Sequence, residues 1–388
     1  MSQFTKVAYQ ENPQTQVPRI RLPYLDGLRG IAALYVLMCH VYTAIMFGCD
    51  GAGASSISLQ FLKLFKYGHY MVDLFIVLSG YVLSIPIVVA STTLKGGFWT
   101  YFSKRVVRII PPFYLSLMLA FLVSQMPSVP GFRTIITESP LSQYVAHLFL
   151  VNNWSQSWRI GSNQPLWSVA VEWQIYMMFP LVLLPIWKRF GVVTMVILAI
   201  VGGITVNLIT SGLYSSAHTW FVGLFAIGVL TAEICHGVSN NLSIIKSWKS
   251  IWIIPIGMFA SVSIANRWVD FSEARFMWLS DTLIGIGFAA AILALTSQSS
   301  RVGGGGRFIE ILTSRPIQFL GSISYSVYLF HWPLLEVVMK TALAMKLNAD
   351  MLVSSVIFVG VPTIVAVCAL LSMLVEQPMI RLAKRLPT

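Results

Sequence analysis

The sequence predicts an all-α, polytopic membrane protein with about ten transmembrane helices and both termini in the cytoplasm. The chain has 388 residues, of which 56% are hydrophobic and only 10% are charged, and its mean hydropathy is +0.75. Soluble domains carry about a quarter charged residues. A chain this poor in charge therefore requires lipid to cover much of its surface.

The apolar residues lie in runs long enough to cross a bilayer, which takes about 20 helical residues. Ten such runs are predicted as spans, at residues 30–47, 70–90, 110–126, 168–187, 191–210, 217–236, 251–265, 278–298, 318–340 and 351–375. A shorter apolar patch at residues 144–151 is interpreted as an interfacial or re-entrant segment. We expect a transmembrane domain at residues 23–377, between cytoplasmic tails at 1–22 and 378–388.

The basic residues predict the orientation of these spans. With ten spans, 18 of the 26 Lys and Arg residues fall on the side of the amino terminus and 8 on the opposite side. Because cytoplasmic loops are enriched in Lys and Arg, this bias favours cytoplasmic termini. Topology thus explains the net charge of +12, and nucleic acid is not an expected partner. No cleavable signal is expected, because the first 20 residues lack an apolar stretch.

Two ionisable residues lie on one face of the first predicted span. Arg29 and His40 are eleven residues apart, almost three helical turns, which separates them by about 16 Å along the helix. A neutral imidazole inside the membrane suits general-base catalysis near neutral pH. The alternatives are an arginine that only sets topology and a histidine that only packs between helices.

His69 and Asp73 are four residues apart and share a face of the second predicted span. A carboxylate in this position orients an imidazole and stabilises its protonated form. The alternative is an interhelical hydrogen bond that only stabilises the bundle.

Ser168 and Glu172 are four residues apart at the start of the fourth predicted span. Their hydroxyl and carboxylate suit the binding of an acceptor, and Trp154, Trp158 and Trp167 suit stacking on a sugar ring. Tryptophans at a membrane interface are also common anchors without any ligand.

Arg105 and Arg108 are three residues apart on the cytoplasmic side of the third predicted span. Two forked guanidinium groups bind phosphate oxygens well. A cluster that only follows the positive-inside rule is the alternative.

Several segments, in this order along the chain, resemble the signatures of the membrane-bound acyltransferase-3 family. They are Tyr24-Leu-Asp-Gly-Leu-Arg29 with His40, Val72-Asp73 through Gly80, Lys104-Arg105-Val-Val-Arg108 with Pro112 and Tyr114, Ser168-Val-Ala-Val-Glu172-Trp, Ser324 through His331-Trp-Pro, and Glu376-Gln-Pro. Ile76 departs from the family pattern, in which an aromatic residue is more usual.

The resemblance implies transfer of an acyl group, typically acetyl, from cytoplasmic acyl-coenzyme A to a hydroxyl of a glycan or lipid-linked acceptor. It implies a bacterial inner membrane location, His40 as the base with Asp73 and Glu172 assisting, and donor contacts from Arg29, Arg105 and Arg108. Ser168 and Trp167 are expected to contact the acceptor.

Other interpretations remain open from the sequence. A covalent acyl-histidine on His40 competes with direct transfer. A transporter or flippase of an acylated lipid or small molecule competes with an enzyme. No cluster of histidines and carboxylates has metal-ligand spacing, so neither a metal site nor a permanently bound cofactor is expected. The oligomeric state stays open, with a homodimer among the options.

Overall fold

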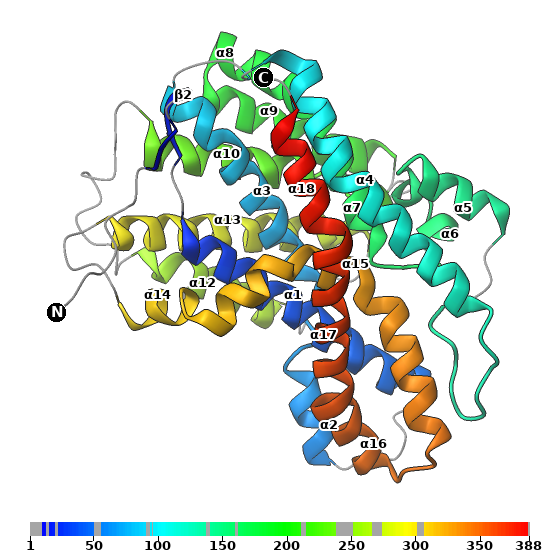
Figure 1. The fold of residues 1–388 in the computed structure, drawn as a ribbon. Coiled ribbons are helices and arrows are strands. Elements are labelled where there is room, and N and C mark those ends of the chain that lie inside the picture. The colour runs from blue at the N-terminus through cyan, green and yellow to red at the C-terminus, as the bar shows by residue number, and fades with distance from the viewer. Residues whose placement is uncertain are drawn as a thin grey trace. The chain divides into compact units, whose positions relative to one another are not determined.

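The structure is a computed structural model that describes residues 10–12, 15–19, 22–49, 56–90, 94, 96–136, 140–159, 162–210, 215–237, 251–265, 274–300 and 306–386. These residues are almost entirely helical (Figure 1). The exception is a short antiparallel hairpin of β1 (Gln10–Asn12) and β2 (Thr15–Arg19). The predicted helical class is confirmed, with this hairpin as an addition inside the predicted amino-terminal tail.

Helices occupy all ten segments in which spans were predicted. Among the described residues, seven helical stretches are long and apolar enough to cross a membrane: Pro23–Gly48, His69–Ala90, Gly97–Ser124, Leu166–Phe190, Val192–Ile209, Phe276–Ser299 and Ala349–Arg385. The helices α10 (Phe221–His236) and α12 (Ile253–Ala265) are apolar but shorter. The helix α15 (Arg315–Ala344) is long but contains three Ser, two Tyr and one His. The count of ten spans and the sides of the termini remain predictions.

Several helices extend beyond the predicted spans. The helix α4 runs from Gly97 to Ser124, although its predicted span began at residue 110. Pro111 and Pro112 lie inside α4 rather than at its start. The basic segment before them is therefore helical, which projects Arg105 and Arg108 from one continuous helix. At the other end of the chain, α18 (Gln377–Arg385) makes most of the predicted carboxyl-terminal tail helical.

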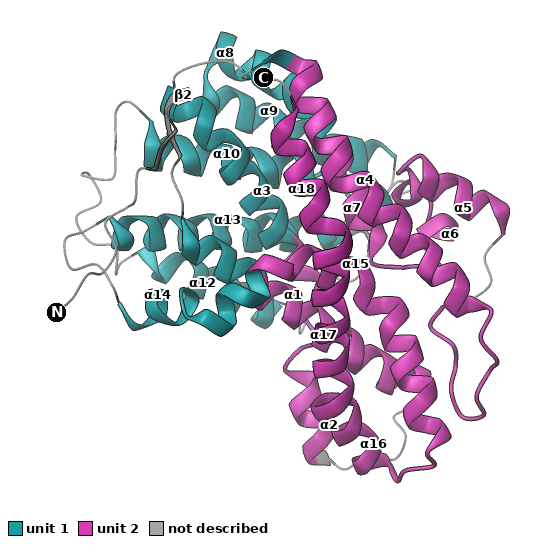
Figure 2. Ribbon diagram, viewed as in Figure 1, with its two compact units in different colours: residues 1–29, 73–97, 175–321 teal, residues 30–72, 98–174, 322–388 magenta. Residues whose placement is uncertain are grey.

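The chain divides into two compact units, coloured separately in Figure 2. Unit 1 comprises residues 1–29, 73–97 and 175–321, and unit 2 comprises residues 30–72, 98–174 and 322–388. The boundaries fall within five helices, which are α1 (Pro23–Thr43), α3 (His69–Ala90), α4, α7 (Leu166–Met178) and α15.

Unit 1 is built on packed apolar helices. Besides the parts of shared helices, it contains η3 (Phe179–Leu183), α8 (Leu184–Phe190), α9 (Val192–Ile209), η4 (Ser215–Ala217), α10, α12, α13 (Ala274–Ser299) and α14 (Arg307–Leu312). The helix α10 packs against α9 and α13, and α12 packs against α13. Gly191, with φ of 89°, forms the left-handed turn that ends α8 and begins α9.

Glycines bring α3 and α10 into backbone contact within unit 1. A Cβ atom at Gly80 would lie 2.0 Å from the carbonyl oxygen of Phe225, and one at Gly228 would lie 2.1 Å from that of Val77. Small residues of this kind allow membrane helices to approach closely. This packing fixes the part of α3 that begins at Asp73.

Unit 2 surrounds the buried central part of α15. It also contains η1 (Ala44–Gly48), α2 (Ser56–Lys63), α5 (Leu141–Leu148), η2 (Asn152–Trp154), α6 (Gln156–Arg159), α16 (Ala349–Ser355), η6 (Val356–Gly360), α17 (Val361–Leu371), η7 (Ser372–Glu376) and α18. The residues from α16 to α18 form one helix with two π-helical turns. The short elements α5, η2 and α6 pack against one another.

A buried ion pair holds the loop after α4 against α15. The Nζ atom of Lys340 lies 3.0 Å from the Glu336 carboxylate, and both side chains are buried. Glu336 also accepts a hydrogen bond from the backbone N–H of Ile135, and Lys340 donates to the carbonyl of Met126. The loop is therefore anchored at both of its ends.

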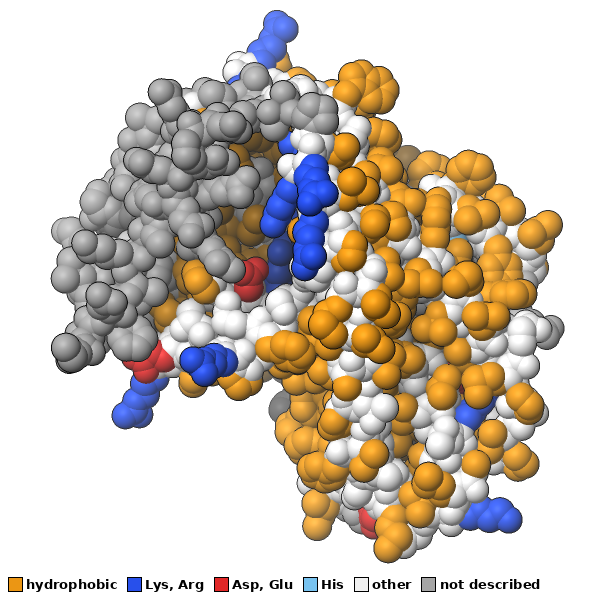
Figure 3. All heavy atoms as spheres, viewed as in Figure 1, with side chains coloured by type: hydrophobic (Ala, Val, Ile, Leu, Met, Phe, Trp, Pro, Cys, Tyr) orange, Lys and Arg blue, Asp and Glu red, His pale blue; other side chains and the backbone are white. Residues whose placement is uncertain are grey.

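Apolar side chains dominate the visible face of unit 2, whereas Lys and Arg side chains gather in a strip where α18 lies (Figure 3). Large hydrophobic residues that are exposed include Phe121, Leu181, Ile197, Ile256 and Phe358. Exposed apolar surface of this extent marks a lipid or protein contact. This exposed apolar surface and the apolar helices together indicate that the chain is an integral membrane protein.

Candidate active site

Two histidines meet in unit 2, on helices far apart in the sequence. The Nδ1 atom of His40, on α1, lies 2.7 Å from the Nε2 atom of His331, on α15. Their rings are nearly parallel, at 4°, with centroids 4.9 Å apart. The edge of Trp332 packs against His40, with centroids 4.7 Å apart, and helps to hold the imidazole in place.

A second hydrogen bond determines how the protons are arranged in this pair. The Nδ1 atom of His331 lies 2.8 Å from the carbonyl oxygen of Val327, which only accepts hydrogen bonds. The proton of neutral His331 is therefore on Nδ1, and its Nε2 accepts from Nδ1–H of His40. Neutral His40 is then left with an unprotonated Nε2 atom. This is the tautomer that a general base requires.

A polar group extends from the histidine pair along α15. The ring of Tyr328 contacts that of His331, with centroids 6.0 Å apart. The Tyr328 hydroxyl lies 2.5 Å from Oγ of Ser168, at the start of α7. Glu172, one turn further along α7, is partly buried and acts electrostatically on the Tyr328 phenol. The structure thus brings Ser168 and Glu172 to the group that contains His40.

Trp167 and Arg159 lie beside this polar group in unit 2. The guanidinium carbon of Arg159 lies 4.7 Å from the centroid of the Trp167 ring. The ring of His69 stacks on that of Trp167, with centroids 6.0 Å apart. Trp167 is only 6% exposed, whereas Trp154 is 52% exposed. A sugar ring would therefore find more free aromatic surface on Trp154 than on Trp167, whose predicted acceptor contact remains a prediction.

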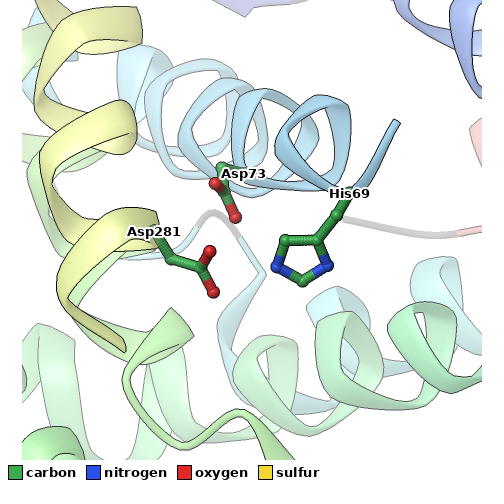
Figure 4. A group of neighbouring side chains, drawn as sticks. All are labelled: His69, Asp73 and Asp281. Carbon is green, nitrogen blue, oxygen red and sulfur yellow. The ribbon is translucent and has the colours of Figure 1, made fainter. Parts of the chain in front are cut away.

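Asp73 has a carboxylate neighbour that the sequence did not suggest. Within unit 1, Asp73 of α3 and Asp281 of α13 are both fully buried, and their carboxylate oxygens lie within 4.8 Å (Figure 4). Asp281 accepts a hydrogen bond from Nε1 of Trp220. His69 stands one turn before Asp73 on the same helix. Two buried carboxylates this close share a proton or hold a cation, although the sequence predicted no metal site.

The predicted donor-binding arginines lie on two helices. Arg29 is partly buried on α1, the continuous helix that also carries His40. Arg105 and Arg108 are partly buried on α4, and the guanidinium of Arg105 lies 5.6 Å from the ring centroid of Tyr101. Their predicted contact with the donor remains a prediction.

Four residues that matter to this geometry were not chosen as site residues from the sequence, namely Arg159, Asp281, Tyr328 and His331. Tyr328 and His331 belong to the motif of residues 324–333, which is the one signal that pointed to them. Arg159 is a basic residue outside the predicted cytoplasmic loops, and the sequence carries no further signal for it. Asp281 is an isolated carboxylate in an apolar run, without a titratable neighbour in the sequence.

Comparison with known proteins supports the same family. A model of the acyltransferase-3 family, described as an acyltransferase domain, matches residues 22–373. The chain is 27% identical over 341 residues to O-acetyltransferase OatA of Staphylococcus aureus, covering 81% of this chain and 50% of that protein. It is 24% identical over 358 residues to peptidoglycan O-acetyltransferase OatA of Listeria monocytogenes, covering 83% and 50%.

A third relative is acyltransferase MdmB of Streptomyces mycarofaciens, which is 32% identical over 171 residues, covering 42% of this chain and 40% of that protein. The chain spans about half the length of the OatA relatives that it matches. No solved structure shows a significant similarity to it. Because the family model covers most of its length, the chain belongs to the membrane-bound acyltransferase-3 family.

Proposed function

We propose that this protein transfers an acyl group, typically acetyl, from acyl-coenzyme A to a hydroxyl of a glycan or lipid-linked acceptor at a bacterial inner membrane. The observation that carries the proposal is the hydrogen bond from His40 to His331, which leaves a basic nitrogen on His40. The names of the relatives, two O-acetyltransferases and an acyltransferase, support the same class of reaction.

The proposed reaction uses His40 as a general base. Its Nε2 atom takes the proton of the acceptor hydroxyl while the hydroxyl oxygen attacks the thioester carbonyl carbon. The tetrahedral intermediate then expels the thiolate of coenzyme A, which receives the proton from the His40 imidazolium. The products are the ester and free coenzyme A, so that no external proton or co-reactant is needed. General acid–base catalysis of this kind typically increases a reaction rate by 10²–10⁴-fold.

The donor and the acceptor are assigned to different groups of residues. Arg105 and Arg108 are suited to the phosphates of coenzyme A, since forked guanidinium groups bind phosphate oxygens bidentately. Arg29 is proposed to assist them from the same helix as His40. Ser168 and Glu172 are suited to the acceptor, because both lie at the Tyr328 end of the polar group.

Asp73 has a different proposed role from Glu172. It is held within unit 1 by the close crossing of α3 and α10, and its neighbour is Asp281. As the family resemblance implies, we assign Asp73 to assisting the base; neither of its carboxylate oxygens has a hydrogen-bond partner among the described residues.

Release of free thiol from acetyl-coenzyme A by detergent-purified protein tests the proposal, with a panel of mono- and disaccharide acceptors. We expect acceptor-dependent release that falls by at least about 10²-fold in His40→Ala. The control is His236→Ala, which removes a histidine of α10 that bonds Tyr81 in unit 1. Folded protein that releases no thiol with any acceptor, or full activity in His40→Ala, would contradict the proposal.

A labelling experiment distinguishes direct transfer from a covalent acyl-histidine. Protein is incubated with radiolabelled acetyl-coenzyme A alone, quenched, and examined for label. Direct transfer predicts no labelled protein in the absence of acceptor. Label that is lost in His40→Ala would establish the covalent route.

A further inference from the structure

Arg159 carries a positive charge that is not neutralised in the described part of the molecule. It ends the short helix α6 and is partly buried. Its Nε atom is buried without a hydrogen-bond partner, and no described carboxylate forms an ion pair with it. A buried charge without a counter-ion is costly. The contacts of Arg159 are instead aromatic, with the Trp167 ring and, electrostatically, the Tyr328 phenol.

The guanidinium of Arg159 lies close enough to Tyr328, a member of the polar group, to act on it electrostatically. Burial lowers the pKa of the Arg159 guanidinium, and the nearby Tyr328 phenol opposes that shift. An anion bound at this position would favour the charged form further. Trp167, whose ring Arg159 contacts, is itself buried and stacked on His69.

A second unsatisfied group lies at the same stretch of α15. Asn163 is fully buried, and its Nδ2 atom donates to the carbonyl of Leu329, the residue after Tyr328. Its Oδ1 atom has no hydrogen-bond partner among the described residues. A cation and a free acceptor oxygen together match a ligand that offers an anionic group and a hydroxyl.

A chain of ring contacts links Tyr328 to the proposed base. The ring centroids are 6.0 Å apart from Tyr328 to His331 and 4.9 Å apart from His331 to His40. Arg159 acts electrostatically on the Tyr328 phenol, so a ligand bound to Arg159 would lie at the Tyr328 end of the polar group that contains His40.

From these contacts we infer that Arg159 is a specificity-determining residue, which binds a carboxylate or phosphate carried by the acceptor close to the hydroxyl that is acylated. The inference rests on the proposed acyl transfer and deepens it, since it assigns the acceptor to the class of acidic or phosphorylated glycans. Glu172 acts on the same phenol with the opposite charge and suits a hydroxyl of the acceptor.

The test compares acceptors that differ only in charge, using a neutral disaccharide, the same disaccharide with one hexose oxidised to a hexuronate, and the same disaccharide with a phosphomonoester. Thiol release from acetyl-coenzyme A gives KM and kcat for each. We expect the wild type to show a KM at least about tenfold lower for the charged acceptors, since hydrogen bonds to charged groups carry that much discrimination. The hexuronate and phosphate arms show which anion is preferred.

Three variants isolate the role of the guanidinium. Arg159→Gln is expected to raise KM for the charged acceptors at least about tenfold and to leave KM for the neutral one within about threefold. Arg159→Lys retains the charge and recovers part of the loss. Arg133→Gln, which removes an exposed arginine of the loop after α4, is expected to change neither KM.

Binding without turnover separates this inference from the proposed function. The hexuronate disaccharide should raise the thermal unfolding midpoint of detergent-solubilised wild type and fail to do so in Arg159→Gln. Stabilisation by the hexuronate disaccharide without thiol release would support the anion site and would refute acyl transfer. Equal KM values for neutral and charged acceptors in the wild type, or an equal rise for both in Arg159→Gln, would overturn the inference.

Discussion

The hydrogen bond between His40 and His331 has a direction that a neighbouring bond imposes. Because His331 donates from Nδ1 to the carbonyl of Val327, only its Nε2 remains to accept from His40. The pair therefore resembles the orienting half of a catalytic triad, with an imidazole in the place of the carboxylate. A neutral partner stabilises the imidazolium less than a carboxylate does, but it fixes the tautomer equally well.

His331 is thus expected to act as a positioning residue. His331→Ala should lower kcat by about 10–100-fold, because His40 then rotates and exchanges tautomers, while KM for acetyl-coenzyme A stays within about threefold. His331→Gln should recover much of kcat, because its amide oxygen also accepts from His40. Thiol-release kinetics measure both effects. A parallel fall in thermal stability for both variants, with no difference in kcat between them, would indicate a role in packing only.

The sequence predicted individual members of the site but not their partners. His40 was identifiable because a titratable residue inside an apolar helix is costly and so invites a functional explanation. Its partner His331, like the partner Tyr328 of Ser168, comes from a helix more than a hundred residues away. Such pairs depend on how helices pack, which neither helical periodicity nor local spacing encodes. Arg159 was missed for the same reason, because the local sequence does not show its contacts with Trp167 and Tyr328.

At the scale of elements, backbone contact between α3 and α10 gives unit 1 a definite packing. Gly228→Ala would place a methyl group 2.1 Å from the carbonyl oxygen of Val77, so the helices must separate. We expect destabilisation of about 1–3 kcal/mol, read as a lower thermal unfolding midpoint in detergent. Gly202→Ala on α9 is the matched control, because a methyl group there meets nothing within 4 Å. Equal midpoints for the two variants would contradict this packing.

The ion pair of α15 predicts that single and double substitutions of Glu336 and Lys340 differ in their effect on stability. Removing one partner, in Glu336→Leu or Lys340→Met, leaves the other charge buried and should cost about 3–5 kcal/mol. The double variant should recover a substantial part of that loss, because no uncompensated charge remains. Thermal unfolding of the three variants tests this. Single variants as stable as the wild type would mean that water reaches the pair and that the loop is not anchored by it.

Helices as elements were more predictable than their ends. Every span that was predicted from a long apolar run lies on a helix. The reason is that the backbone inside a bilayer must satisfy its own hydrogen bonds. The helix α4 begins thirteen residues before the predicted span, and it continues through Pro111 and Pro112. Hydropathy reports where a helix is apolar, whereas polar helical turns before and after it contribute nothing to that signal.

For the whole molecule, the amino-acid composition was enough to predict an integral membrane protein. The shortage of charge and the exposed apolar side chains, together with the long apolar helices, indicate contact with lipid. The number of spans is a separate matter, since α10, α12 and α15 lie outside the seven stretches that meet the length and composition of a span. If all three also cross the bilayer, the chain has ten spans and both termini share a side. If none does, the termini lie on opposite sides.

Labelling of single added cysteines in the full chain distinguishes ten spans from seven. Lys63, Lys346 and Lys384 are exposed, and three native cysteines are buried with the fourth, Cys39, partly so. Ten spans with cytoplasmic termini predict that a membrane-impermeant maleimide labels Lys63→Cys and Lys346→Cys in intact spheroplasts, and Lys384→Cys only after permeabilisation. Seven spans would place residues 63 and 346 on opposite sides, because five of those stretches lie between them. Wild-type protein supplies the background from the native thiols. Labelling of only one of residues 63 and 346 in intact spheroplasts would therefore refute the ten-span topology and, with it, the shared side of the termini.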